Sequence, residues 1–342
     1  MTQAMKVMVA GVGGASLGTE ILKSLHLAGG YRTYGCDVSS TAYGLYETRF
    51  ERTYLVDREN YVASVINACI DAGATVLIPG GEAPMVLLGR AADMLRQSGI
   101  RLACNSPEVI STCSDKAKTF SVLASLGIEI PATTIIDDGD CVNKVGLPCV
   151  VKPATGTGGS AMVFFATEID EALVYADYIR RMGGTPVAQE YLPDDTGEFT
   201  VGVLSMPDGR IAGSIALRRA LDAKLSVMMR SRGGVISSGY SQGYISDFPE
   251  IRQQCEIIAR ALGSTGPLNI QGRMRGSAFV PFEINPRFSA STHLRAMAGF
   301  NEIDLYLRAM TGNAVEAPTT VREGWYLRSL TEQFVAPEQI RT

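Results

Sequence analysis

The sequence predicts an α/β protein in which a doubly wound parallel sheet precedes two further units of strands and helices. Three observations lead to this fold class. Short apolar segments alternate with longer helical ones through the first third of the chain, a glycine-rich segment follows an apolar strand, and two strands carrying oxygen side chains flank a turn at 275–277. A chain of 342 residues also exceeds the usual size of one hydrophobic core. We therefore expect units over 1–110, 111–188 and 189–342.

The first unit is predicted from its alternating elements. Strands are expected at Lys6–Ala10, Tyr31–Asp37 and Thr75–Pro79, and helices at Leu17–Ala28 and Val62–Ala72. Strands that alternate with helices form a parallel sheet with helices on its faces. This order predicts a Rossmann-like domain.

A glycine-rich turn follows the first predicted strand. The segment Gly11–Ser16 opens a helix and Asp37 ends the next strand, as in dinucleotide-binding sites, although Ser16 stands where the third glycine is expected. The same turn, with Pro79–Glu82, could instead meet a second substrate, because ligands bind at the carboxyl ends of such strands. Both alternatives stay open.

Composition excludes several classes of protein. The net charge of −4 gives no reason to bind nucleic acid, and seven scattered cysteines without a CxxC pair favour reduced thiols. No apolar run approaches the roughly 18 to 20 residues that span a bilayer. We expect a cytoplasmic protein that contacts neither nucleic acid nor membrane.

The second unit is predicted to begin with a helix and a glycine loop. Ser114–Asp115 can cap a helix that runs to Leu126, where Gly127 ends it. The strand Pro148–Pro153 then enters a glycine-rich loop whose backbone N–H groups can approach phosphate oxygens and close over them. The glycines expected to act this way are Gly156, Gly158 and Gly159.

Two later segments predict a metal site. Gly266–Gln271 and Pro281–Arg287 are expected to form antiparallel strands, and alternate side chains of a strand share a face. Oxygen atoms of Gln271, Glu283 and Asn285 could then converge on one Mg²⁺, which prefers few protein ligands plus phosphate and water.

Arginines near this face are candidate catalytic residues. Arg287 could face a transferring phosphoryl group, and Arg230 and Arg232, which lie beside glycines, could clamp a carboxylate or an acyl phosphate. In the alternative, Glu283 and Asn285 only line a surface hairpin, and Arg230 and Arg232 are exposed charges on a loop.

The order of these landmarks resembles that of the ATP-grasp superfamily, most closely the synthetase domains of the carbamoyl-phosphate synthetase large subunit. The resemblance covers nearly the whole chain and implies a Rossmann-like pre-ATP-grasp domain followed by a two-subdomain ATP-grasp fold. The matching segments, in chain order, are 114–116, 150–153, the glycine loop, 189–192, Glu198, 269–271 and 283–287.

The resemblance also implies roles at the nucleotide site. Lys116 and Lys152 would contact ATP phosphates, Glu190 would accept from the adenine amino group, and the backbone at Tyr191 and Leu192 would meet the ring edge. Glu198 would bind the ribose hydroxyls, although its spacing from Leu192 is one residue longer than in the synthetase pattern.

These implications predict an ATP-dependent carboxylate–amine ligase that forms an acyl phosphate and releases ADP and phosphate. Its cofactors would be ATP and Mg²⁺, with Mn²⁺ as a substitute. Its partners would be a small carboxylate and an amine or ammonia, and a homodimer is the assembly to test. Two alternatives remain: a small-molecule kinase with the same ATP site, and a regulatory protein that binds ATP without turnover.

Overall fold

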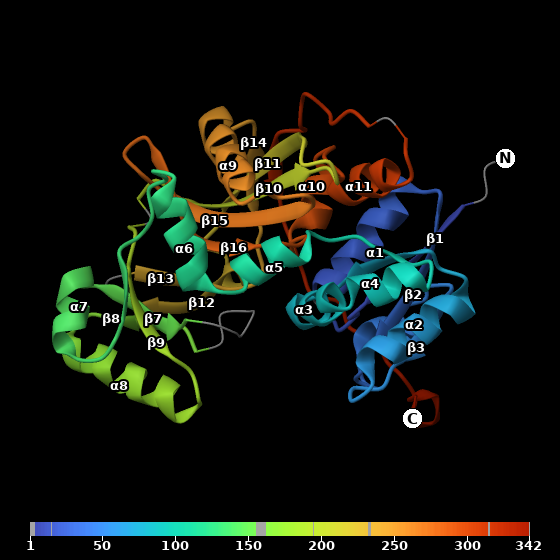
Figure 1. Cartoon of the computed structure of the whole chain (residues 1–342), viewed down its shortest axis with the longest axis horizontal. Coiled ribbons are helices and arrows are strands. Elements are labelled where there is room, and N and C mark those ends of the chain that lie inside the picture. The colour runs from blue at the N-terminus through green and yellow to red at the C-terminus, as the bar shows by residue number, and fades with distance from the viewer. Residues whose placement is uncertain are drawn as a thin grey trace.

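The computed structural model describes residues 4–14, 16–154, 162–193, 195–231, 234–313 and 315–341, without the side chains of residues 230 and 231. Its described strands form three main sheets and one hairpin (Figure 1). No helix in this described part is long and apolar enough to cross a membrane.

The first sheet is parallel, with strand order β3-β2-β1-β4-β5. Its strands are β1 (Met5–Ala10), β2 (Tyr31–Asp37), β3 (Arg52–Leu55), β4 (Val76–Pro79) and β5 (Arg101–Leu102), and its helices are α1 (Leu17–Ala28), α2 (Tyr61–Ala72), α3 (Glu82–Arg90) and α4 (Ala92–Gln97). Val7 and Val9 of β1 share a core with α1, whereas Met8 and Ala10 share one with α2. Helices therefore cover both faces, which confirms the doubly wound sheet.

The second sheet is antiparallel and small, with strand order β6-β9-β7-β8. It consists of β6 (Thr133–Ile135), β7 (Cys149–Pro153), β8 (Phe164–Ala166) and β9 (Pro186–Glu190), covered by α7 (Gly139–Val145) and α8 (Ile169–Arg181). Val142 of α7 and Ala172, Ala176 and Ile179 of α8 pack on the buried strand residues. The two helices lie on the outer side of the sheet (Figure 1).

The third sheet has six antiparallel strands in the order β16-β15-β10-β11-β14-β17. These strands are β10 (Glu198–Ser205), β11 (Ile211–Arg219), β14 (Gly243–Ser246), β15 (Pro267–Arg275), β16 (Ala278–Asn285) and β17 (Gly324–Tyr326), and β12 (Val227–Ser231) pairs with β13 (Gly234–Ser237) as a separate hairpin. One face packs against α5 (Pro107–Cys113), α6 (Lys116–Ser125) and α9 (Pro249–Ala261). The strands flanking the turn at 275–277 are therefore antiparallel, as predicted.

Helix α6 begins where the sequence predicted. Asp115 is its N-cap and its Oδ1 accepts from the Lys118 backbone N–H at 3.0 Å. Gly127 follows with a φ of 73°, in the left-handed region that stops a helix. Phe120 and Leu123 of this helix pack against the six-stranded sheet. The predicted boundaries between units stay predictions.

The first and third units share a core. Ile21 and Leu25 of α1 cluster with Leu294 of α10 (Thr292–Met297) and Ile303 of α11 (Glu302–Met310), on the second face of the six-stranded sheet. After β17 the chain returns to the parallel sheet, where Arg341 Nη1 donates to Thr53 O at 2.7 Å (Figure 1). The small four-stranded sheet stands apart from this junction.

Candidate active site

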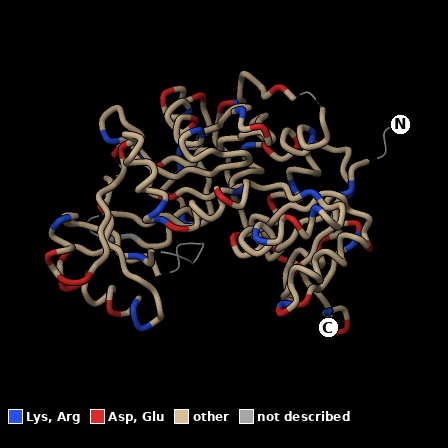
Figure 2. Tube along the Cα trace, in the orientation of Figure 1, with Lys and Arg blue, Asp and Glu red and all other residues tan. Residues whose placement is uncertain are grey.

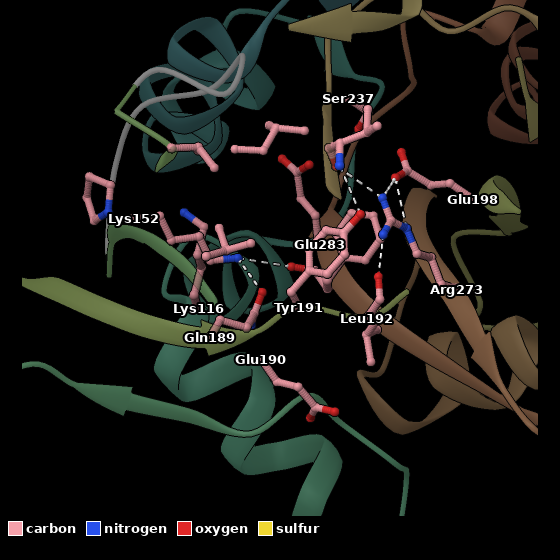
Figure 3. Close-up of a pocket in the computed structure, with 16 residues that line it drawn as sticks. Lys116, Lys152, Gln189, Glu190, Tyr191, Leu192, Glu198, Ser237, Arg273 and Glu283 are labelled. Carbon is pink, nitrogen blue, oxygen red and sulfur yellow. Dashed lines mark hydrogen bonds and ion pairs between the residues drawn. The ribbon is translucent and has the colours of Figure 1, made fainter. Parts of the chain in front are cut away.

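A pocket lies where the four-stranded sheet faces the six-stranded sheet (Figure 3). The four-stranded sheet contributes β7, β9 and the segment after β9. The six-stranded sheet contributes β10, β15 and β16, and the hairpin strand β13 closes one side. The lining residues that carry polar chemistry are Lys116, Lys152, Gln189, Glu190, Tyr191, Glu198, Ser237, Arg273 and Glu283.

Lys152 supplies a buried positive charge to this pocket. Its ammonium donates to Gln189 Oε1 at 2.7 Å and lies 3.4 Å from Phe282 O. The pKa of Lys152 is lowered to about 7, mainly by burial and also by repulsion from Lys116, while Glu283 opposes both effects. An ammonium held in this way gains strongly from an arriving anion.

Lys116 stands at the start of α6 and lines two adjoining pockets. The first is the pocket of Lys152, and the second contains Glu283 and Asn285 together with Glu82, which begins α3. The two lysines lie on the same side of the pocket in Figure 3. A polyanion entering here would meet two cations on one side and the predicted metal ligands on the other.

Glu198 lies at the start of β10, with 1% of its side chain exposed. Its Oε2 accepts from Arg273 Nη2 at 2.8 Å and from Arg273 Nε at 3.2 Å, and its Oε1 lies 3.3 Å from Arg219 Nη1. Within the described residues Oε1 has no hydrogen-bond partner. The carboxylate predicted to bind ribose is thus held between two guanidinium groups and keeps one acceptor atom unused.

Arg273 is a pocket residue that the sequence reasoning missed. Its guanidinium donates to Leu192 O and, at 3.3 Å, to Val235 O, and it lies 4.9 Å from the ring centroid of Tyr191 (Figure 3). Two signals could have found it: it lies two positions after Gln271 on the same strand, and a charged residue there conflicts with an apolar core.

Glu190 and Leu192 occupy the pocket edge. The Glu190 carboxylate accepts hydrogen bonds from Arg275 Nη2 at 2.6 Å and from the Ala132 backbone N–H at 3.0 Å. Figure 3 shows its side chain turned away from the cluster around Arg273. Leu192 is buried and lines the pocket. Because Arg275 holds Glu190, an adenine contact from this carboxylate requires competition with that ion pair; the role stays a prediction.

The register of β15 and β16 brings the predicted metal ligands to one place. Gln271 lies opposite Glu283, and Asn269 lies opposite Asn285. Gln271 Oε1 accepts from Arg219 Nη1 at 3.3 Å. Asn269 is buried, and its Oδ1 accepts from Arg295 Nη2 at 2.6 Å, which leaves it a structural role.

The donor atoms at this face suit a hard cation. Gln271, Glu283 and Asn285 offer only oxygen among their metal-binding atoms, and the described residues contain no cluster of three His, Cys, Asp or Glu that could hold a metal. A cation bound here would thus have one carboxylate and need further oxygen ligands. That composition fits Mg²⁺ shared with phosphate groups and water.

Arg287 lies two residues after β16, the strand that carries two of the predicted metal ligands. Its Nη1 donates to Phe288 O at 2.9 Å, while its Nε is buried without a hydrogen-bond partner in the described part of the chain. Burial lowers the pKa of Arg287, and the nearby carboxylates Glu82 and Glu283 counteract it. The side chain is therefore placed between the metal face and the loop that follows β4.

Several predicted residues cannot be placed. Gly156, Gly158, Gly159 and Arg232 lie outside the described residues, and Arg230 belongs to β12 by its backbone only.

The N-terminal glycine turn is described except at residue 15. There Asp37 Oδ2 accepts from the Val12 backbone N–H at 2.8 Å and fixes the turn beside a cavity.

Comparisons with known proteins support the fold and the predicted resemblance. Residues 185–333 match the family model described as ATP-grasp in the biosynthetic pathway with Ter operon. The carbamoyl phosphate synthase large chain of Xylella fastidiosa is 25% identical over 253 residues, which cover 69% of this chain and 22% of that one. These matches confirm the predicted resemblance to the ATP-grasp superfamily and to carbamoyl-phosphate synthetase. The chain spans about a fifth of the length of such relatives.

Solved structures share the ATP-grasp fold at low sequence identity. The biotin carboxylase domain of Hydrogenobacter thermophilus 2-oxoglutarate carboxylase, solved with MgADP, ADP and bicarbonate, has a TM-score of 0.67 at 17% identity and covers 92% of this chain and 72% of its own. An L-amino acid ligase from Bacillus licheniformis has a TM-score of 0.63 at 18% identity, with 91% and 75% covered. The predicted ATP-grasp fold is thereby confirmed.

Proposed function

We propose that this ATP-grasp protein is an ATP-dependent carboxylate–amine ligase. The observation that carries the proposal is the buried ammonium of Lys152, which lies beside Lys116 and faces the oxygen ligands of β15 and β16. The similar solved structures include an L-amino acid ligase and a carboxylase domain with bound MgADP, which favours the same nucleotide and metal here.

In the proposed reaction a substrate carboxylate oxygen attacks the γ-phosphorus of ATP. The bond from that phosphorus to the β,γ-bridging oxygen breaks, ADP leaves and an acyl phosphate forms. An amine nitrogen then attacks the acyl carbon, the carbon–oxygen bond to phosphate breaks, and the nitrogen loses a proton. Phosphoryl transfer of this kind depends on alignment and charge stabilisation more than on a protein nucleophile.

Each group of residues has a part in this reaction. Lys116 and Lys152 bind the phosphate chain, and Arg287 stabilises negative charge on the moving phosphoryl group. Gln271, Glu283 and Asn285 would hold Mg²⁺, which supplies charge neutralisation at the phosphate oxygens. From the sequence alone, we expect the glycine loop to close over the phosphates and Arg230 and Arg232 to clamp the carboxylate or the acyl phosphate.

The test is ADP release measured over panels of carboxylates and amines, with and without hydroxylamine. The ligase predicts substrate-dependent ADP release and a hydroxamate when hydroxylamine replaces the amine. A stable phosphorylated product without hydroxamate would favour the kinase alternative. Binding of ATP with ADP release at background level across all panels would favour the regulatory alternative.

A further inference from the structure

A second charged cavity lies where α1 meets α10 and the segment after β17. Its volume is about 460 Å³, and its charged or titratable lining residues are Glu20, Lys23 and His26 of α1, Arg49, His293 of α10 and Arg328. None of the residues described as lining it lines the nucleotide pocket. The cavity is therefore a separate feature, and the inference drawn from it does not rest on the proposed ligase activity.

Arg328 is the most buried cation of this cavity, with 7% of its side chain exposed. Its Nη2 lies 3.2 Å from Glu20 Oε2 and also donates to Ala290 O, but its Nε has no hydrogen-bond partner in the described part of the chain. Lys23 shares the same carboxylate, with its Nζ 2.8 Å from Glu20 Oε1. One carboxylate thus serves two cations.

The other titratable groups do not correct this imbalance. Arg49 is neutralised by Glu47 at 2.7 Å. The Nδ1 of His293 is buried and has no partner among the described residues. Burial lowers the pKa of His293; Glu20 raises it, and Lys23, Arg328 and Arg49 lower it. Lys23, Arg328 and His293 therefore line one cavity in which positive charge exceeds the single carboxylate of Glu20, and buried charge of this kind is costly without a counter-ion.

Apolar side chains lie around the same cavity. Leu27, Met297 and Leu327 line it with 53%, 49% and 69% of their surface exposed. Exposed apolar residues gathered beside a charged hollow are typical of sites for a ligand that has both characters. Inorganic anions alone would leave these three side chains in water.

We propose that this cavity binds a small carboxylic acid with an apolar body. The carboxylate would accept from Arg328 and Lys23 and from protonated His293, and the body would cover Leu27, Met297 and Leu327. Because α1 belongs to the first unit and Arg328 to the third, the bound acid would bridge the two units.

The chain offers a direct probe because it contains only two histidines, His26 and His293. NMR of the labelled imidazoles, assigned with His26→Gln, follows each one as 4-methylpentanoate is added without ATP. Binding should move the His293 titration to higher pH by about half a pH unit or more, because a nearby anion favours the charged imidazole. The neutral amide, 4-methylpentanamide, should leave His293 unchanged.

Variants separate a binding site from a structural ion pair. Arg328→Gln should weaken 4-methylpentanoate binding by about tenfold or more, and Lys23→Gln, at a more exposed position, by a smaller factor. Arg96→Gln removes an exposed cation of α4 and is the matched control, with unchanged affinity. If Arg328→Gln does not fold, Lys23→Gln carries the test.

Three results would overturn the proposal: an unmoved His293 signal, an amide that acts like the acid, or Lys23→Gln and Arg328→Gln proteins that bind like the wild type. Inorganic phosphate that moves His293 as strongly as the acid does would overturn the apolar part, because phosphate cannot cover the three exposed side chains.

Discussion

The chemistry of single residues in this protein is governed by buried charge. Lys152, Arg287 and Arg219 are each cations whose pKa is lowered mainly by burial. Such groups are poorly solvated in the free protein, so an anionic ligand gains more from them than from exposed cations. Of the three, Lys152 lines the pocket between the two antiparallel sheets, so this pocket favours an anionic ligand.

Lys152 leads to a prediction about pH. In the free protein its pKa is about 7, and bound phosphate must raise that value because it favours the ammonium form. ATP should therefore bind most tightly below pH 7, where Lys152 is already protonated. Above pH 7 the protein should take up a proton when ATP binds, and the affinity for ATP should fall by up to about tenfold per pH unit. Calorimetry in buffers of different ionisation enthalpy measures this uptake. In Lys152→Met, binding should be weak and its remaining pH dependence only that of ATP itself.

Glu283 leads to a prediction about the metal. Glu283→Gln keeps the shape of the side chain but removes the only carboxylate among the three predicted ligands. We expect ADP formation to fall by about a hundredfold or more, because a Mg²⁺ site with amide ligands alone is weak. Glu59→Gln, at an exposed position, is the matched control. Normal turnover in Glu283→Gln at low Mg²⁺ would contradict the metal assignment.

At the scale of elements, Arg273 joins parts of the chain that are distant in sequence. From β15 it reaches Glu198 of β10, Leu192 after β9 and Val235 of β13 (Figure 3). It therefore fixes the segment that would hold adenine against the strands that would hold the metal. A planar guanidinium can make these contacts together, whereas an ammonium cannot.

The expected effect of changing Arg273 is on nucleotide binding. Arg273→Lys keeps the positive charge but loses most hydrogen bonds of the planar guanidinium. The KM for ATP should therefore rise about tenfold while kcat changes less. Arg273→Leu leaves Glu198 with one cation and should also lower stability by about 3 kcal/mol or more. Measurement of both kinetic constants with thermal unfolding separates the two effects. An unchanged KM in both variants would show that Arg273 has no part in positioning.

The sequence predicted regular elements better than it predicted contacts. Helix α1, with its strong amphipathic pattern, and strand β2 were placed at their observed bounds, and the facing of Gln271 and Glu283 follows from strand alternation. The pairing of Glu198 with Arg219 and Arg273 was not foreseen, because cross-strand neighbours depend on the register of β10 with β11 and with β15. Register is a property of the folded sheet and cannot be read from one strand.

At the scale of the molecule, the charged residues of the described trace are spread over all three units, and both signs are interspersed (Figure 2). The first and third units are joined by the core around α1 and by the last residues of the chain. Gln333 Nε2 donates to Tyr46 O at 2.6 Å, and Arg341 donates to Thr53 through both Nη atoms. These contacts lie away from the nucleotide pocket and should serve stability alone.

Arg341→Ala tests that division of roles. Loss of its hydrogen bonds to Thr53 should lower the free energy of unfolding by about 1 to 2 kcal/mol, without a change in the KM for ATP. Chemical denaturation and steady-state kinetics on the same preparation measure both quantities. Arg181→Ala, in an exposed i,i+4 ion pair of α8, should change stability by less than about 0.5 kcal/mol.

We propose that Lys152 and the oxygen ligands of β15 and β16 together form one Mg²⁺–ATP site. Calorimetric titration of a non-hydrolysable ATP analogue, with and without Mg²⁺, tests it most directly in the wild type, Lys152→Met and Glu283→Gln. We predict tight binding that requires Mg²⁺ in the wild type, weak binding in Lys152→Met with or without the metal, and loss of the Mg²⁺ requirement in Glu283→Gln. Equal binding by all three proteins, whether or not Mg²⁺ is present, would contradict the assignment of these residues to one Mg²⁺–ATP site.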